Sequence, residues 1–363
     1  MNKFQQDQIQ RVSQQSAPEW LTSVREAGAS AFTEAPWPTR KTEAFKYCSL
    51  KALGEVGFDA AAPALEDVAD VAIAAAIPGL DTYRLVLVNG VLDEAQSDAQ
   101  ALDQVVRFSQ ANAEQQALIS QYLGKVNPAG ANQHLFNSLN DAALSDGFLI
   151  HIERNQKLDK PLQICSLSTS AEAGFSINQR VLVVLETSAE LTLIEQYSSL
   201  SDEKDSSFTN ALTEVNVGDN ARLNHYRLQL MQEDALHIGS SWVNLQRDAN
   251  YDAFHLGLGS EITRNDLVVR HSVGGSHAEI AGVYVPKNSQ LVDFHTDIEH
   301  EAAHCTSNEV FRGIINDQAK AVFNGRIHIH KDAQKTLAEL SNKNLLLTNK
   351  AEINTKPELE IYA

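Results

Sequence analysis

The residues best suited to chemistry are two histidines near the end of the chain. In the segment KAVFNGRIHIHKDAQKT, residues 320–336, His328 and His330 stand two positions apart. Imidazole pairs with this spacing can hold zinc or copper, but a stable site needs at least one further ligand. No third ligand is identifiable from the sequence. We therefore expect the two side chains to face solvent together, without binding a metal.

A second group of metal-binding residue types lies in DFHTDIEHEAAHC, residues 293–305. It contains His295, His300, His304 and Cys305, whose side chains are of the kinds that bind iron, zinc or copper. Their spacing matches no established zinc pattern, and polar residues on an exposed strand and turn explain them as well. We predict no catalytic, cofactor-binding or metal-binding residue, with these four as the weak candidates for a metal site.

Patterns typical of enzymes are incomplete. The segment SVGGSH, residues 272–277, has a pair of glycines but no phosphate-loop lysine. Serine, histidine and aspartate are common, yet no G-x-S-x-G turn presents a nucleophile. The residues therefore show no evident active site.

Composition limits the possible partners and compartment. The 363 residues carry 47 acidic against 29 basic side chains, a net charge of −18, which disfavours nucleic acid and anionic membranes as partners. The three cysteines, Cys48, Cys165 and Cys305, are odd in number and far apart, so they indicate no disulfide framework. No apolar stretch approaches the roughly 20 residues of a membrane span, and the N-terminus has no signal core. We expect a cytoplasmic protein.

Residues 1–145 have a mixed pattern. Helical spacing of apolar residues predicts helices within 4–32, 64–80, 111–124 and 130–147. Between them, TYRLVLVNGVLDEAQ places Asn89-Gly90, a strong hairpin-turn signal, between two apolar runs. We predict an N-terminal mixed helical region over residues 1–145.

From residue 146 onward one template recurs. A small residue has apolar residues six and four positions before it and another two positions after it. The small residues are Ala189, Ala221, Ala249, Ser289 and Ala351. Ala333 matches only upstream, and Ala319 matches more loosely, through Ile315 and Ala321. Because residues two apart on a strand face the same side, the apolar positions are predicted to face inward. The template thus places Leu345 and Leu347 inside, together with Ile327 and Ile329.

Several intervals between the small residues are near 14 or 28, which is typical of a solenoid that repeats one supersecondary unit. We predict a mainly β fold in which residues 146–363 form a parallel β-helix. A β-sandwich or jelly roll is the alternative, because these folds also contain many short strands.

Four segments resemble one known family. Residues 322–363, VFNGRIHIHKDAQKTLAELSNKNLLLTNKAEINTKPELEIYA, resemble the most recognisable block of the SufB/SufD family, on its SufD branch. PTRKTEAFKYCSL at 38–50, RND at 264–266 and HEAAHCTSNEVFRGII at 300–315 resemble other parts of it. The family supplies the scaffold subunits of Suf-type iron–sulfur cluster assembly.

The resemblance implies a right-handed parallel β-helix between two helical regions. It implies pairing, edge to edge, with a SufB-like paralogue, and binding of a SufC-like ATPase. It also implies that an iron–sulfur cluster rests only transiently on the assembled complex, with no cofactor held firmly by this chain. Alone, the chain is expected to form a homodimer. In the family a Cys- and His-bearing segment and a C-terminal helical region follow PELEIYA, so we expect both to be absent from the sequence given.

Two other functions remain open. One is a β-helical polysaccharide lyase or hydrolase, which would line an outer groove with acids and bases. The other is a plain homo-oligomeric assembly module. Binding of SufB- and SufC-like partners would distinguish the scaffold from both.

Overall fold

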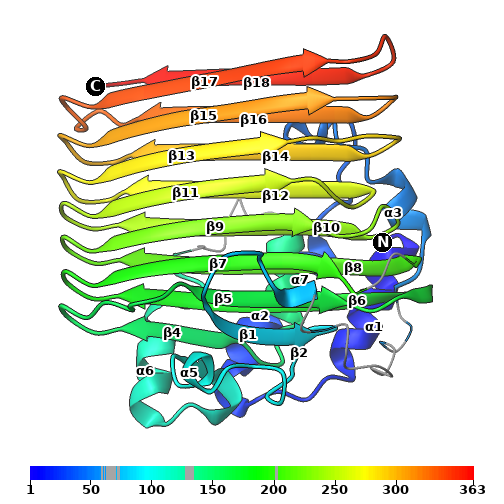
Figure 1. Cartoon of the computed structure of the whole chain (residues 1–363), viewed down its shortest axis with the longest axis horizontal. Helices are drawn as coiled ribbons and strands as arrows, with labels where there is room; N and C mark the ends of the chain where they lie inside the picture. The colour runs from blue at the N-terminus through cyan, green and yellow to red at the C-terminus, as the bar shows by residue number, and fades with distance from the viewer. Residues whose placement is uncertain (59, 61, 63–70, 72–73, 127–134, 201–202) are drawn as a thin grey trace.

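The fold is a coil of β-strands with helices packed outside it (Figure 1). The structure, a computed structural model, describes every residue except 59, 61, 63–70, 72–73, 127–134 and 201–202. From β4 onward, successive strands alternate between two sheets, and from β5 onward each pairs in parallel with the strand one coil earlier. The sheet orders are β17-β15-β13-β11-β9-β7-β5-β1-β2 and β18-β16-β14-β12-β10-β8-β6-β4-β3, in which β2 and β3 pair antiparallel with β1 and β4. The predicted mainly β fold with a parallel β-solenoid is confirmed, and its right-handed sense stays a prediction.

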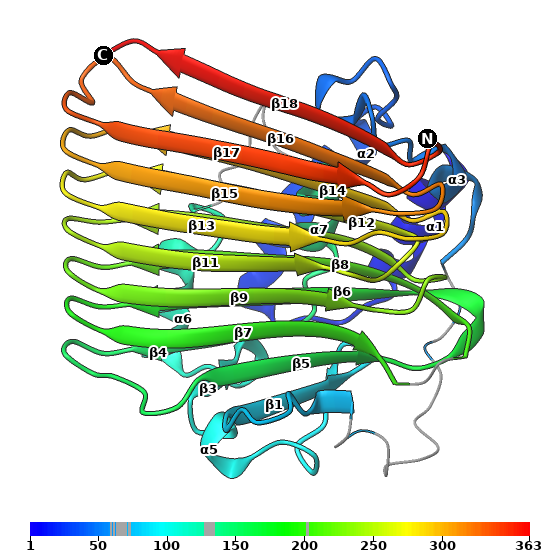
Figure 2. The same cartoon turned by 45° about the horizontal axis from the view of Figure 1, so that its top comes forward.

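The first sheet consists of β1 (Tyr83–Val88), β2 (Val91–Leu92), β5 (Leu162–Ser168), β7 (Glu190–Ser199), β9 (Arg222–Leu230), β11 (Asn250–Gly257), β13 (His277–Tyr284), β15 (Thr306–Ile315) and β17 (Leu337–Leu346). The second sheet consists of β3 (Val105–Arg107), β4 (Phe148–Ile152), β6 (Ala171–Leu185), β8 (Asp205–Val217), β10 (Leu236–Leu245), β12 (Ile262–His271), β14 (Leu291–His300), β16 (Lys320–Ile329) and β18 (Glu352–Ile361). In Figure 2 the strands of both sheets stack in chain order toward β17 and β18.

The period of the coil lies near the predicted 28 residues in the middle of the solenoid and is longer at both ends, where Val183 pairs with Val215 and Lys320 with Glu352, each 32 positions later. Arg222 pairs with Asn250, 28 positions later, and Leu291 pairs with Lys320, 29 positions later. Inward-facing side chains of both sheets form one continuous core. Because the partners are in register, residues one coil apart lie side by side on the same face.

The small residue of the template sits in the tight turn between sheets. Ala221 is fully buried and donates its N–H to the Gly218 carbonyl, 3.1 Å away. Ala189, Ala249, Ala319 and Ala333 are also fully buried and close equivalent turns. A larger side chain there would meet the core, which explains why the pattern was visible in the sequence.

At two places the template assigned the wrong residues to the inward face. Ser289 is exposed, and the next residue, Gln290, takes the buried place in that turn. Leu345 and Leu347 are 56% and 54% exposed rather than inward. Leu345 pairs with the outward Ile314, so the inward face of β17 is displaced by one residue from the prediction.

The N-terminal residues form helices outside the strands. They are α1 (Lys3–Ser13), η1 (Glu19–Leu21), α2 (Thr22–Glu34), η2 (Glu43–Phe45), α3 (Lys51–Glu55), α5 (Ala99–Leu102), η3 (Phe108–Gln110), α6 (Ala113–Tyr122) and α7 (Leu135–Ala142). Asn2 and Asn112 each begin a helix with a capping box. Most of the helix predicted over 64–80 falls outside the described residues. In the part of the chain that the structure describes, no helix has the length and apolarity needed to cross a membrane.

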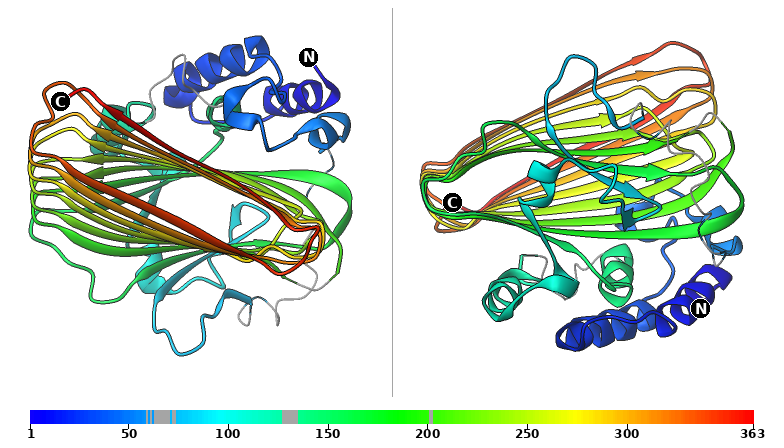
Figure 3. Two further views of the ribbon diagram at one scale, coloured as in Figure 1. Left: turned by 90° about the horizontal axis from the view of Figure 1, so that it is seen from above. Right: turned by 60° about the horizontal axis from the view of Figure 1, so that its bottom comes forward.

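Helices α1, α2, α3, α6 and α7 lie on the outer face of the second sheet, as Figure 3 shows along the coil axis, whereas α5 packs against β1 and β3 at the start of the coil. Phe4, Phe32 and Phe136 pack with Phe208 and Leu236 of the sheet in one apolar cluster. Apolar contact on this scale fixes the helices to the solenoid.

The predicted hairpin is confirmed. Val88 pairs with Val91, and Asn89 and Gly90 between them both have positive φ, 51° and 81°, as a two-residue type I′ turn requires. Strands β1, β2 and β3 extend the two sheets although they precede residue 146.

Candidate functional site

The four weak metal candidates do not converge. His295 faces outward on β14, with its Nε2 2.8 Å from Asp293 Oδ1. His300 lies inside the coil, stacked on His271 with the ring centroids 4.3 Å apart. His304 is exposed in a turn, whereas Cys305 is buried. Residues 295 and 300 occupy opposite faces of one strand, so they cannot share a metal.

The environment of His300 also disfavours its charged form. Its Nε2 lies 2.9 Å from Ser307 Oγ in the interior. Burial lowers the pKa of His300 to about 4, although the nearby Glu299 acts in the opposite direction. The imidazole is therefore neutral at pH 7 and serves as a hydrogen-bonded core residue.

His328 and His330 face outward side by side, as predicted. Ile327 and Ile329 between and beside them are 3% and 7% exposed, and the two imidazole rings stack with centroids 4.1 Å apart. The expectation that no third ligand lies near them is wrong. Glu299 of β14 places its Oε2 2.9 Å from His328 Nδ1 and 2.6 Å from His330 Nε2.

Glu299 meets the histidines because it pairs in register with His328. The two residues are 29 positions apart, which is the period of the coil. Among the described residues, Glu299, His328 and His330 form the one group of three potential ligands whose donor atoms all lie within 4.8 Å of one another. The repeat length in the sequence was the signal that could have found this group.

Arg326 joins this group to further acids. Its Nη1 donates to Glu299 Oε1 at 2.6 Å and to Asp297 Oδ1 at 2.8 Å, and its Nη2 donates to Glu360 Oε2 at 2.9 Å. We call Asp297, Glu299, Arg326, His328, His330 and Glu360 the outer-face cluster. It spans the last three strands of the second sheet.

A charged cluster inside the coil was not predicted. Glu195 accepts hydrogen bonds from Tyr197 Oη at 2.7 Å and from Thr213 Oγ1 at 2.9 Å, and its Oε1 lies 2.7 Å from His225 Nε2. Burial favours the neutral acid, yet the charge of Arg227 and these bonds hold the pKa of Glu195 well below its ordinary value. Polar residues at inward positions leave no trace in a hydrophobic pattern, so only the structure reveals this network.

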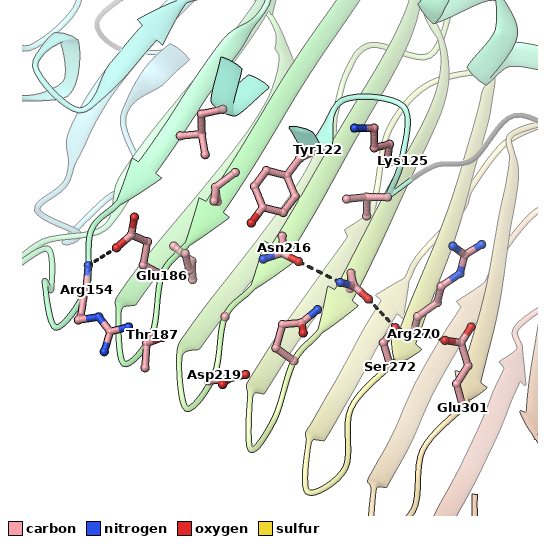
Figure 4. A pocket seen from close by; sticks show the side chains of 17 residues that line it. Tyr122, Lys125, Arg154, Glu186, Thr187, Asn216, Asp219, Arg270, Ser272 and Glu301 are labelled. Carbon is pink, nitrogen blue, oxygen red and sulfur yellow. Dashed lines mark hydrogen bonds between the residues drawn. The ribbon is translucent and has the colours of Figure 1, made fainter. Parts of the chain in front are cut away.

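A groove of about 690 Å³ lies between the end of α6 and the second sheet (Figure 4). Its wall contains a hydrogen-bonded polar row: Asn244 Nδ2 donates to Asn216 Oδ1 at 2.9 Å, and Ser272 Oγ donates to Asn244 Oδ1 at 2.6 Å. Its charged lining combines bases such as Lys125 with acids such as Glu186. Because these signs are mixed, the groove does not select a class of ligand.

The solenoid ends in an open edge. β17 and β18 are the last strands of their sheets, and no other described strand lies beyond them. They and their flanking residues carry seven large apolar side chains that are 44–63% exposed: Leu337, Leu345, Leu346, Leu347, Leu359, Ile361 and Tyr362. We call these two strands, with those side chains, the open edge. Backbone groups on such an edge can pair with a strand of another chain.

Comparison with known proteins establishes the family. A family model described as the SufBD protein N-terminal region matches residues 2–164, and one described as "SUF system FeS cluster assembly, SufBD core domain" matches residues 167–363. The chain belongs to the SufBD family. The predicted resemblance is therefore confirmed across nearly the whole sequence.

Individual relatives support a SufD-like assignment within the SufBD family. The iron–sulfur cluster assembly protein SufD of Escherichia coli is 31% identical over 330 residues, covering 90% of this chain and 74% of the relative. A SufBD family protein of Synechocystis is 27% identical over 352 residues, covering 94% and 77%. SufD of Bacillus subtilis is 26% identical, covering 63% of this chain and 52% of the relative.

Proposed function

We propose that this SufBD-family protein is a non-catalytic scaffold subunit of iron–sulfur cluster assembly that pairs with a SufB-like paralogue through its open edge. The observation that carries the proposal is the edge itself. Each of its two strands is ten residues long, and main-chain hydrogen bonds along such strands can supply affinity while the apolar side chains supply packing. A paralogue with the same repeat would offer strands of matching length.

The remaining partners follow from family membership. A SufC-like ATPase would supply the ATP hydrolysis, and a nascent iron–sulfur cluster would be cargo of the assembled complex, held only transiently. We also propose a cytoplasmic location. All three cysteines are free and buried, and free thiols are usual in a reducing compartment.

A second copy of this chain is the other occupant that the open edge could accept. Apolar side chains such as Leu359 and Tyr362, 59% and 63% exposed, are costly in water, so self-pairing would bury them when the paralogue is absent. We expect a homodimer in isolation that gives way to the heteromer. A polysaccharide lyase or hydrolase is disfavoured by the family match, which describes cluster assembly.

Co-expression with a SufB-like paralogue and a SufC-like ATPase tests the proposal. Native mass spectrometry of the purified complex should show one copy of this chain per paralogue. The double variant Leu359→Glu/Ile361→Glu should abolish that species, because two carboxylates would be desolvated in the interface. Leu80→Glu is the matched control, since Leu80 is also exposed, at 44%, but lies in the N-terminal region.

The mass of the complex distinguishes a scaffold that pairs through the open edge from a plain assembly module. Loss of the paralogue with the edge variant, and its retention with the control, supports pairing through the open edge. Retention by both variants would place the interface elsewhere. A parent chain that forms only homodimers with every partner present would favour the plain assembly module.

A further inference from the structure

We propose that Glu299, His328 and His330 form a binding site for a divalent first-row metal ion, Zn²⁺ or Fe²⁺, on the outer face of the second sheet. The three proposed ligands belong to β14 and to β16 and its following turn, whereas the open edge consists of β17 and β18. Two imidazoles and one carboxylate are a donor set that both ions accept in proteins.

Two of the distances between donor atoms are shorter than those around a bound ion. Tetrahedral bonds of about 2.0–2.1 Å place neighbouring ligand atoms roughly 3.3–3.4 Å apart. In the structure Glu299 Oε2 is 2.9 Å from His328 Nδ1 and 2.6 Å from His330 Nε2, and all three donor atoms lie within 4.8 Å of one another. Small side-chain rotations would open this cluster around an ion, with water in the remaining position.

The scaffold holds these side chains on rigid elements. His328 and His330 are two residues apart and therefore share the outer face, while Ile327 and Ile329 fix the backbone through the core. Glu299 is brought alongside by continuous parallel pairing of β14 with β16. Sites built on paired strands lose little conformational entropy when they bind.

Arg326 orients the carboxylate without occupying the oxygen that the metal needs. It donates to Glu299 Oε1 at 2.6 Å, whereas Oε2 faces the histidines. Asp297 and Glu360 hold Arg326 in turn. Such outer contacts fix the direction of a ligand and raise metal affinity. Three carboxylates against one guanidinium also leave the outer-face cluster with a net negative charge, which attracts cations.

One hydrogen bond must break when an ion binds. Arg326 Nη2 lies 3.0 Å from His328 Nδ1, the nitrogen that would bind the metal. Arg326 would keep its bonds to Asp297 and Glu360 after this contact is lost, so its charge would remain paired. The entry route is open, because the His330 side chain is 40% exposed.

Metal titration of the purified full chain tests the site. After removal of metal with a chelator, Zn²⁺ should bind at one ion per chain by calorimetry, and Co²⁺ should give the absorption spectrum of a nitrogen–oxygen site. The double variant His328→Ala/His330→Ala should lose this binding. Glu299→Gln should weaken it roughly tenfold or more. Anaerobic Fe²⁺ in competition with Zn²⁺ shows which of the two ions binds more tightly.

His151→Ala is the matched control. His151 also faces outward on the second sheet, with its Nε2 3.1 Å from Glu186 Oε1. Unlike Glu299, Glu186 belongs to no group of three potential ligands among the described residues. This control should bind Zn²⁺ like the parent. Thermal unfolding of each variant checks folding, and His330→Gln, at the most exposed ligand, provides a variant least able to disturb the sheet. The proposal would be overturned if the parent chain bound no metal. It would also be overturned if the double variant or His330→Gln bound metal with the stoichiometry and affinity of the parent.

Discussion

Arg264 on β12 lies over the ring of Phe45 of the N-terminal region, with its guanidinium carbon 4.1 Å from the centre of the phenyl ring. The same guanidinium donates to the Ala44 carbonyl at 2.6 Å and forms ion pairs with Asp266 at 2.7 Å and Asp293 at 2.8 Å. Its side chain is fully buried. One residue therefore fastens the segment FKYC to the solenoid, and joins two of the segments that carried the family resemblance.

Replacing Arg264 should loosen this attachment. Arg264→Gln removes the buried cation from beside Asp266 and Asp293, and breaking one side of a buried ion pair typically costs about 3–5 kcal/mol. We expect a loss of that order in the free energy of unfolding, measured with urea. Arg222→Gln breaks an ion pair whose arginine is 50% exposed, so it should cost less than about 1 kcal/mol. Equal effects of the two changes would contradict the anchoring role.

The reactivity of the Cys48 thiol measures how firmly the N-terminal segment is attached to the solenoid, without unfolding the whole protein. The residue is 1% exposed, and burial, reinforced by Asp293, raises the pKa of its thiol. A thiol that is both buried and protonated reacts slowly. In Arg264→Gln, alkylation of Cys48 by iodoacetamide should accelerate, as followed by peptide mass spectrometry.

Cys165 provides an internal control for that measurement. It is also buried, on β5, and burial raises the pKa of its thiol to about 12, but it does not contact the Arg264 anchor. If Cys48 and Cys165 accelerate equally, Arg264 acts on the whole fold rather than on the N-terminal segment.

The inward face of the solenoid was predictable where turns have constant length. Val217, Ala221 and Leu223 follow the template because the tight turns from β6 to β7, from β8 to β9 and from β10 to β11 all have the same length. At Ser289 the turn places its buried residue one position later, and a shift of one residue exchanges the two faces of a strand. A hydrophobic pattern cannot detect such a slip when both faces carry apolar residues, as they do around Leu345.

The outer-face cluster shows which contacts a local sequence pattern does not predict. His328 and His330 were found from their local spacing, whereas Glu299 required the coil period to be applied to polar residues as well. The interior partners Glu195 and His225 are 30 positions apart and embedded in apolar strands. Their pairing depends on packing between coils, which no local pattern encodes.

The exposure of Leu347 changes the expected effect of a substitution there, because the template had placed this side chain in the core. At 54% exposure, Leu347→Asp places a carboxylate in water in the monomer, so the melting temperature should change little at concentrations low enough to keep the chain monomeric. Leu245 is fully buried in the core, and Leu245→Asp should cost several kcal/mol, roughly, since a carboxylate there has no polar partner. Circular dichroism melts of both variants would show the contrast, and equal destabilisation would mean that Leu347 is covered in solution.

Glu309 should make the protein less stable as pH rises. Its side chain is fully buried on β15, and Thr296 Oγ1 donates to its Oε2 at 3.3 Å. Burial raises the pKa of Glu309 from 4.5 to about 8, the Thr296 bond opposes this, and Asp297 adds to it. The folded protein therefore keeps this proton at pH 7, whereas the unfolded chain has released it.

The sign of the pH dependence follows from that difference in bound protons. Below pH 4.5 both states are protonated and Glu309 contributes no slope. Between 4.5 and about 8 the folded state holds one proton more, so the free energy of unfolding falls by about 1.4 kcal/mol per pH unit. Glu309→Gln keeps the shape and removes the titration, so in urea unfolding it should gain stability relative to the parent from pH 5 to pH 8. Every other group is common to both proteins, so curves that stay parallel over this range would show that the buried carboxyl does not hold its proton.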